Sequence, residues 1–294
     1  PFDPRVFDRG HPGRPSEVVP RQFPKIANPE RQPFQHGSGR LELAREIVSR
    51  SNPLTARVFV NRVWMHHFGK PLVNTPGDFG LRSDPPTHPE LLDWLAAEFA
   101  EGWRVKALHK RIMLSAAYTQ SSLDDDTGLK ADPENRLLWK QNRRRLDFEA
   151  LHDSLLAVSG NLDLTPGGPS VPLFGRRRAV YGYVDRLEFP SLLTTFDVPN
   201  PATLTPERTS TTVAPQALYL MNGPFARAAA KRLAASQKAR DPGERLDAIF
   251  RTLFGRTPTT GERELSLKYV AKGDDRWGDL VHGLLMANEF AFVD

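Results

Sequence analysis

The sequence predicts a mainly α-helical fold: a single helical domain with a Pro-rich extended N-terminal arm and a small irregular β insertion. Apolar residues recur at helical spacing over most of the chain after residue 40. Seven prolines fall between residues 4 and 33, too many for a helix or an interior strand. Between residues 161 and 212 the helical rhythm stops. We therefore expect an arm over 1–39 and one helical domain over 40–294, with the insertion near 161–212.

Residues that are typical of helix starts and helix ends define the helices in the first half of the sequence. Asn52 followed by Pro53 is typical of an N-cap and a first helical residue, and Gly69 is a typical C-terminal stop. Thr87 is expected to cap the helix that opens at His88. The helices predicted from these signals and from apolar spacing lie near 40–48, 53–68, 88–101 and 106–119.

Helical spacing resumes on both sides of the insertion. Gly167, Gly168 and Pro169 predict a turn, and the run Ala179–Val184 has the β-branched and aromatic composition of a short strand. The helices predicted around this insertion lie near 134–141, 148–158, 215–221, 224–235, 243–254, 260–271 and 277–290. Two segments near the C-terminus, Asp247–Arg256 and Leu280–Phe290, are amphipathic and are expected to form a closing helical layer.

Composition excludes several kinds of site. The chain has no Cys, so disulfides, thiolate catalysis, zinc–thiolate sites and covalently attached c-type haem are excluded within it, and we expect no cofactor in this chain. It has no apolar run of about 18 residues, so no transmembrane segment is expected. It opens on Pro1 rather than Met, so we expect any targeting segment to lie upstream.

The net formal charge of +5 favours an acidic partner, such as an acidic protein, a membrane surface or an anionic polymer. Two runs, Arg143–Arg145 and Arg176–Arg178, concentrate positive charge locally. Such runs usually form a solvated face or local ion pairs. Nucleic-acid binding is disfavoured because no stacking aromatics accompany them.

An ordered series of sequence blocks resembles a known family. The blocks are Arg9–Pro12, Asn61–Gln120, Phe196–Pro199, Arg208–Thr212, Pro215–Leu218, Asn222-Gly223, Asn288–Phe290 and Val293-Asp294. Together they resemble the planctomycete family whose domain of unknown function follows a cytochrome c-like domain. The resemblance implies an extracytoplasmic location (periplasm or cell surface), and a protein partner that is a cytochrome c-like domain or complex. Any haem would lie in that partner chain or in an upstream domain. The resemblance carries no established activity.

One candidate catalytic arrangement can be weighed from residue types. His88, Asp78 and Asp93 fall around the loop over residues 76–86 and are candidates for an acid–base cluster. The alternative is that His88 and its neighbours simply begin a helix. No metal site is expected: the adjacent His66 and His67 point about 100° apart on a helix, and Glu149-x-x-His152 is only half of a di-iron motif.

The best ligand-binding candidate is the loop before Pro215. A Ser/Thr-rich loop that leads into a helix presents hydroxyls and free backbone N–H groups, which suit an anion or a sugar. Arg208 adds a group that can bind a carboxylate or phosphate in a bidentate manner. The alternative is a helix cap with Arg208 paired to an acid such as Asp197. The residues assigned to this candidate site are Asp197, Arg208, Ser210, Thr211, Thr212 and Gln216.

The leading hypothesis is a non-catalytic extracytoplasmic interaction module that belongs to a cytochrome c-containing assembly and binds a protein partner through its arm and exposed loops. The first alternative is a domain that binds or hydrolyses polysaccharide through the Arg208–Gln216 loop and the His88 region. The second alternative is nucleic-acid binding through the basic runs.

Overall fold

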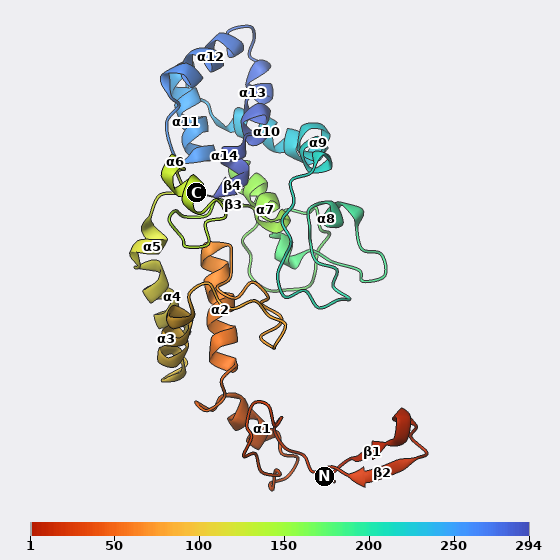
Figure 1. Cartoon of the computed structure of the whole chain (residues 1–294). Helices are drawn as coiled ribbons and strands as arrows, with labels where there is room; N and C mark the ends of the chain where they lie inside the picture. The colour runs from red at the N-terminus through yellow and green to blue at the C-terminus, as the bar shows by residue number, and fades with distance from the viewer. Residues whose placement is uncertain (1, 294) are drawn as a thin grey trace. The chain divides into compact units, whose positions relative to one another are not determined.

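A computed structural model describes residues 2–293 and confirms a mainly helical protein with small two-stranded sheets (Figure 1). Residue contacts divide the chain into two compact units, Pro1–Asn142 and Arg143–Asp294. Each unit has its own cluster of buried apolar side chains. Apolar spacing does not indicate this division, because it shows which face of a helix is buried but not which helices share a core.

Unit 1 begins with the arm, which contains a two-stranded antiparallel hairpin with every residue of both strands exposed. Six helices follow, and α2, α3 and α4 surround a core that includes Val60, Phe68, Leu92 and Leu108. The elements of unit 1 are β1 (Arg5–Phe7), η1 (Asp8–Gly10), β2 (Pro15–Val18), α1 (Arg40–Ile47), α2 (Thr55–Phe68), α3 (Pro89–Ala100), α4 (Val105–Met113), α5 (Ala116–Thr119) and α6 (Asp126–Ala131).

Two predicted helix starts in unit 1 need correction. Helix α2 begins at Thr55 rather than at Pro53, since the Asn52 side chain holds the turn before the helix by binding Leu54 N at 3.0 Å and Thr55 Oγ1 at 3.0 Å. Helix α3 has no side-chain cap: Thr87 N instead donates to Leu72 O at 2.8 Å, which ties the preceding loop to the core.

The predicted helix over 134–141 is wrong, because this stretch is a loop. Asn135 is 3% exposed and adopts a left-handed backbone with φ of 52°, which a helix does not allow. Its Nδ2 donates to Lys140 O at 2.8 Å and to Asn142 Oδ1 at 3.0 Å, so the loop is organised around one buried amide.

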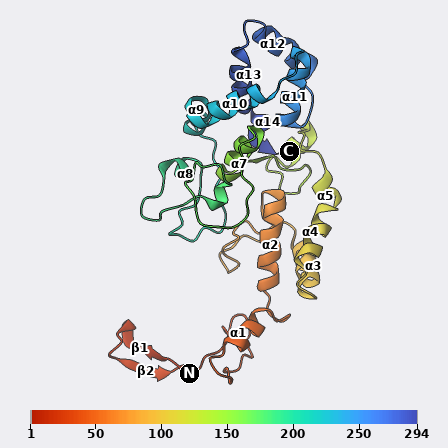
Figure 2. The same cartoon turned by 180° about the vertical axis from the view of Figure 1, so that it is seen from behind.

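Unit 2 contains eight α-helices among its described residues, and α10 lies along α13 in both views (Figure 2). Strands β3 and β4 pair antiparallel, which places Arg145 opposite Phe292. The elements of unit 2 are β3 (Arg144–Arg145), α7 (Phe148–Val158), η2 (Ala179–Tyr181), α8 (Ser191–Thr195), α9 (Ala214–Asn222), α10 (Pro224–Ser236), α11 (Pro242–Phe254), α12 (Thr260–Val270), α13 (Arg276–Leu285), α14 (Asn288–Ala291) and β4 (Phe292–Val293).

The insertion over 161–212 is irregular, as predicted, but the strand expected at Ala179–Val184 is wrong. Residues 179–181 form the 3₁₀ turn η2. The β pairing among the described residues of this stretch is limited to isolated bridges, such as the one between Val171 and Gly182. The cause is Asp153 on α7, which accepts from Ala179 N at 2.7 Å and from Arg178 Nε at 2.9 Å. These two bonds bend the chain where its composition favours an extended strand.

No helix among residues 2–293 combines the length and the apolar character that crossing a bilayer requires. The longest helix, α2, has 14 residues and carries Asn, Arg and His side chains.

Candidate functional site

The predicted acid–base cluster lies in unit 1, where each member has its own local contact. Asp78 Oδ1 accepts from Gly80 N at 2.7 Å, His88 Nδ1 lies 3.0 Å from Thr87 Oγ1, and Asp93 accepts from Arg57 Nε at 2.6 Å. Within the described residues, no hydrogen bond or ion pair joins any two of these three. The contacts are those of a turn, a helix start and a surface ion pair.

Arg208 lies in unit 2 and is held by the first turn of α7. Its guanidinium donates two hydrogen bonds to the Glu149 carboxylate, at 2.7 and 2.9 Å, and lies 3.2 Å from Asp147 Oδ2. These hydrogen bonds raise the pKa of Arg208. Burial is the largest single effect on the pKa of Glu149 and acts to raise it, but the hydrogen bonds from Arg208, a backbone hydrogen bond and the charge of Arg208 together outweigh burial, so the pKa is lowered. The sequence-based alternative, pairing with Asp197, is therefore corrected to pairing with Glu149 and Asp147.

The other predicted ligand-binding residues divide into a connected pair and two exposed hydroxyls. Asp197 accepts from Thr211 N at 2.7 Å and from Thr211 Oγ1 at 2.8 Å, and its backbone is left-handed with φ of 58°. Ser210 and Thr212 are exposed, and among residues 2–293 their side chains have no hydrogen-bond partner within the chain. The Asp197–Thr211 contact fixes the loop shape and leaves these hydroxyls facing solvent.

Gln216 connects this loop to Arg145, a residue that sequence reasoning treated only as part of a basic run. The Gln216 side chain is buried, with the residue 1% exposed. Its Nε2 donates to Thr195 O at 2.8 Å, and its Oε1 accepts from Val213 N at 3.2 Å and from Arg145 Nη1. The position of Arg145 just before α7 is the only sequence feature that points to it. Its contact with Gln216 could not be predicted, because the two residues are 71 positions apart in the sequence.

A cavity of about 210 Å³ opens beside this network, entirely within unit 2. Arg145 and Gln216 form its polar end, and Leu218, Met286 and Phe292 contribute apolar walls. Segments around residues 212–221 and 286–292, far apart in the sequence, thus line one hollow.

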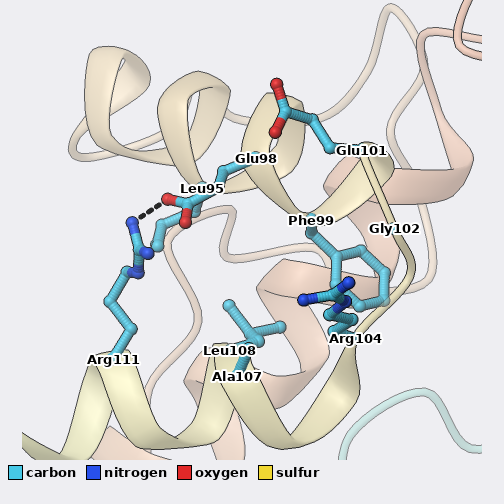
Figure 3. A pocket seen from close by; sticks show the side chains of 9 residues that line it. All are labelled: Leu95, Glu98, Phe99, Glu101, Gly102, Arg104, Ala107, Leu108 and Arg111. Carbon is cyan, nitrogen blue, oxygen red and sulfur yellow. Dashed lines mark hydrogen bonds and ion pairs between the residues drawn. The ribbon is translucent and has the colours of Figure 1, made fainter.

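A larger hollow, of about 370 Å³, lies between α3 and α4 of unit 1 (Figure 3). Leu95, Phe99 and Leu108 supply apolar surface, and the Glu98 carboxylate faces the Arg111 guanidinium in an ion pair. Arg104 lies beside the Phe99 ring in the same view. The charged rim is balanced, so this hollow has no excess of acid or base directed at a ligand.

The α2 groove, as we call the third hollow, measures about 580 Å³ and is mostly apolar. It follows one face of α2 at helical spacing, with Arg62 and His66 towards the C-terminal end of the helix. The lining residues are Leu54, Thr55, Val58, Phe59, Arg62, Val63 and His66.

The helix before the groove, α1, buries none of its residues. Leu41 is 64% exposed, and Ile47 and Val48 are 41% and 49% exposed. An amphipathic helix normally buries its apolar face against a partner element. Here the chain offers an apolar surface from residue 41 to residue 63 that its own described residues do not cover completely.

The histidines of α2 have a partner that the sequence did not indicate. His67 Nε2 lies 2.7 Å from His109 Nδ1 on α4, and the Tyr118 ring meets His67 edge-on. In the described residues no group of three or more His, Cys, Asp or Glu side chains is arranged to hold a metal ion. His152, the histidine of the Glu149-x-x-His152 pattern, is buried and stacks on Phe225 at 4.8 Å between ring centroids.

A sequence model of the family described as PSD1, protein of unknown function (DUF1553), matches residues 39–270. The chain belongs to this family. The PSD1 match begins just before α1 and ends with α12, so it includes both the α2 groove and the Arg145–Gln216 network. Searches of curated proteins and of solved structures found no match.

Proposed function

We propose that this PSD1 chain is a non-catalytic interaction module that binds an acidic amphipathic helix of a partner protein in the α2 groove. The observation that supports the proposal is the exposed apolar surface of α1 together with the largely apolar groove on α2. Exposed apolar patches bordered by polar residues are typical of protein-binding surfaces, and a helix laid in an apolar groove is a common mode of recognition.

Charge decides the kind of helix that we propose. Arg62 and His66 border the groove, and α1 with the following turn adds Arg40, Arg45 and Arg50. Between residues 2 and 54 there are nine Arg or Lys side chains and six Asp or Glu side chains. A partner helix with acidic residues beside its apolar stripe complements this surface, because opposite charges orient the encounter and like charges oppose it.

The assembly that we propose is extracytoplasmic and contains a cytochrome c-like domain as the partner, with haem in that domain. This finer proposal is supported by the sequence blocks that resemble the planctomycete family. It is compatible with the composition, since a chain without Cys cannot attach c-type haem itself.

The proposal that the module is non-catalytic is supported by the ion pairs that the candidate acidic and basic side chains already form. Arg208 binds Glu149 and Asp147, and Asp93 binds Arg57. Catalytic groups must be able to reach a substrate in the correct protonation state. Side chains that are already bound to one another serve better to shape loops and helix ends.

The test is photo-crosslinking from Val58, which lines the groove, in the native host. We expect one crosslinked protein partner whose crosslinked segment is an acidic amphipathic helix. Arg62→Glu should reduce the yield at least fivefold, whereas Arg82→Glu, a charge reversal at an exposed loop position, should leave it unchanged. A crosslinked segment that is basic, a second copy of this chain, a polysaccharide or a nucleic acid would contradict the proposal.

A further inference from the structure

We propose that the cavity beside Arg145 in unit 2 is a binding site for a small monocarboxylate with a short apolar tail. The carboxylate would bind the Arg145 guanidinium, and the tail would occupy the space between α9 and the segment over residues 286–292. This site is separate from the α2 groove, and its existence does not depend on the protein-binding proposal.

The guanidinium of Arg145 is held in place before any ligand arrives. Its Nη1 donates to Thr211 O at 2.8 Å and to Gln216 Oε1, and Gln216 is itself fixed in the interior. Strand pairing with Phe292 fixes the backbone of Arg145. A donor that is already oriented loses less freedom on binding, which favours affinity.

Arg145 also has no acidic partner of its own. Among residues 2–293 no Asp or Glu lies within 4.0 Å of its guanidinium, whereas at least one acidic partner is bound by each of Arg178, Arg208, Arg256 and Arg263 in the same unit. Burial lowers the pKa of Arg145, and the charge of Asp197 opposes that shift from a greater distance. The Asp197 carboxylate is occupied by Thr211. A partly buried cation without a carboxylate is electrostatically suited to receive an anion.

The rest of the cavity indicates what is attached to the anion. Leu218, Met221, Met286 and Phe292 line it with apolar surface, and Met side chains adapt readily to the shape of a bound group. The cavity measures about 210 Å³, so it has room for more than a single small ion. A carboxylate with a tail of about five carbons fits this space, whereas a compact inorganic anion would leave the apolar walls uncovered.

Calorimetric titration of the full chain with hexanoate tests the inference. We expect saturable binding of one hexanoate per chain, with hexanol and hexylamine at least tenfold weaker because they lack the carboxylate. Arg145→Lys should weaken hexanoate binding about tenfold, since Lys cannot form a bidentate contact. Sulfate should compete only weakly.

A second test fills the cavity with a larger side chain and leaves Arg145 unchanged. Met286, which is 39% exposed at the cavity wall, can be replaced by Trp, and Leu265→Trp on the exposed face of α12 is the matched control. We expect Met286→Trp to abolish hexanoate binding with the melting temperature retained, and Leu265→Trp to bind normally. Equal affinity for hexanol, equal affinity for sulfate, or normal binding by Met286→Trp would each overturn the inference.

Discussion

Gln216 shows how much one side chain contributes to the organisation of unit 2. Its amide bonds the backbone of Thr195 at the end of α8, the backbone of Val213 before α9, and the side chain of Arg145 on β3. Three segments separated in sequence are therefore held by a residue that is 1% exposed. Because the interior offers no water to replace these hydrogen bonds, losing one of them lowers the stability of the fold more than losing a hydrogen bond at the surface.

Gln216→Leu should destabilise unit 2 by about 2–4 kcal/mol, since it leaves the Thr195 carbonyl and the Val213 amide without partners. Chemical denaturation of the variant measures the change in the free energy of unfolding. Gln237→Leu, at the less buried end of α10, is the control and should change stability by less than about 0.5 kcal/mol. Equal effects of the two substitutions would show that the Gln216 network contributes little.

His152 predicts a dependence of stability on pH. Burial lowers its pKa, and both ring nitrogens lack a hydrogen-bond partner in the described structure. Asp153 is the nearest charged group, 3.5 Å from Nδ1, but its carboxylate is bound by Arg178 and Ala179. The folded chain excludes a proton that the unfolded chain binds below about pH 6.5, so stability should fall as pH drops below that value.

His152→Leu should remove the fall in folding stability that His152 causes between about pH 6.5 and 5. At pH 8 the substitution should be neutral or stabilising, because it replaces an unpaired polar group by an apolar one. Thermal unfolding at several pH values measures this. His36→Leu, at a side chain 91% exposed whose ion pair with Glu42 is screened by solvent, should leave the acid loss caused by His152 in place. A steeper acid loss in His152→Leu than in the parent chain would contradict the explanation.

At the scale of elements, one capping box of unit 2 is joined to α14 through Arg256, which lies just after α11. Thr259 and Glu262 cap the start of α12, and Arg256 binds Glu262 at 2.8 Å and Glu289 on α14 at 2.6 Å. The hydrogen bonds from Arg256 are the main cause that lowers the pKa of Glu262 to about 2. The ionised form of Glu262 therefore stabilises the fold above its ordinary pKa of 4.5, and this stabilisation is lost as pH falls towards 2.

Glu262→Gln should lower stability at pH 7 by about 1 kcal/mol, because the group is partly exposed and its ion pair is screened by solvent. The difference from the parent chain should shrink between pH 5 and 2. Chemical denaturation across this range checks both statements, with Glu264→Gln on the same helix as the control. A difference that stays constant with pH would exclude the Arg256 pairing as its cause.

The elements with clear sequence signals were predictable, and the others depend on distant contacts. Helix α2 ends at Phe68 before Gly69, as its spacing and its glycine stop predict. The 3₁₀ turn at Ala179 was not predictable because Asp153, 26 residues earlier, sets its backbone. The same holds for the candidate site: residue types indicated the Arg208 loop, but only the fold shows that Glu149 occupies Arg208 and that Arg145 faces the cavity.

At the scale of the whole molecule, two separate apolar cores predict two separately folding units. A chain with a specific protease site inserted between Asn142 and Arg143 should yield two fragments that each keep helical circular dichroism and unfold cooperatively. Parallel unfolding of the uncut chain measures what the covalent connection adds. Loss of helical signal from either fragment on cleavage would show that its core depends on the other unit.

The position of α13 has a practical consequence for defining this family as a folding module. The PSD1 match ends at residue 270, yet α13 contributes Trp277, Val281 and Leu285 to the core and lies along α10. A polypeptide cut at residue 270, where the family-model match ends, would expose the small-residue face of α10, including Ala230, and would be prone to aggregate. The matched range is therefore shorter than the cooperative unit, and recombinant work on relatives should extend about twenty residues past it.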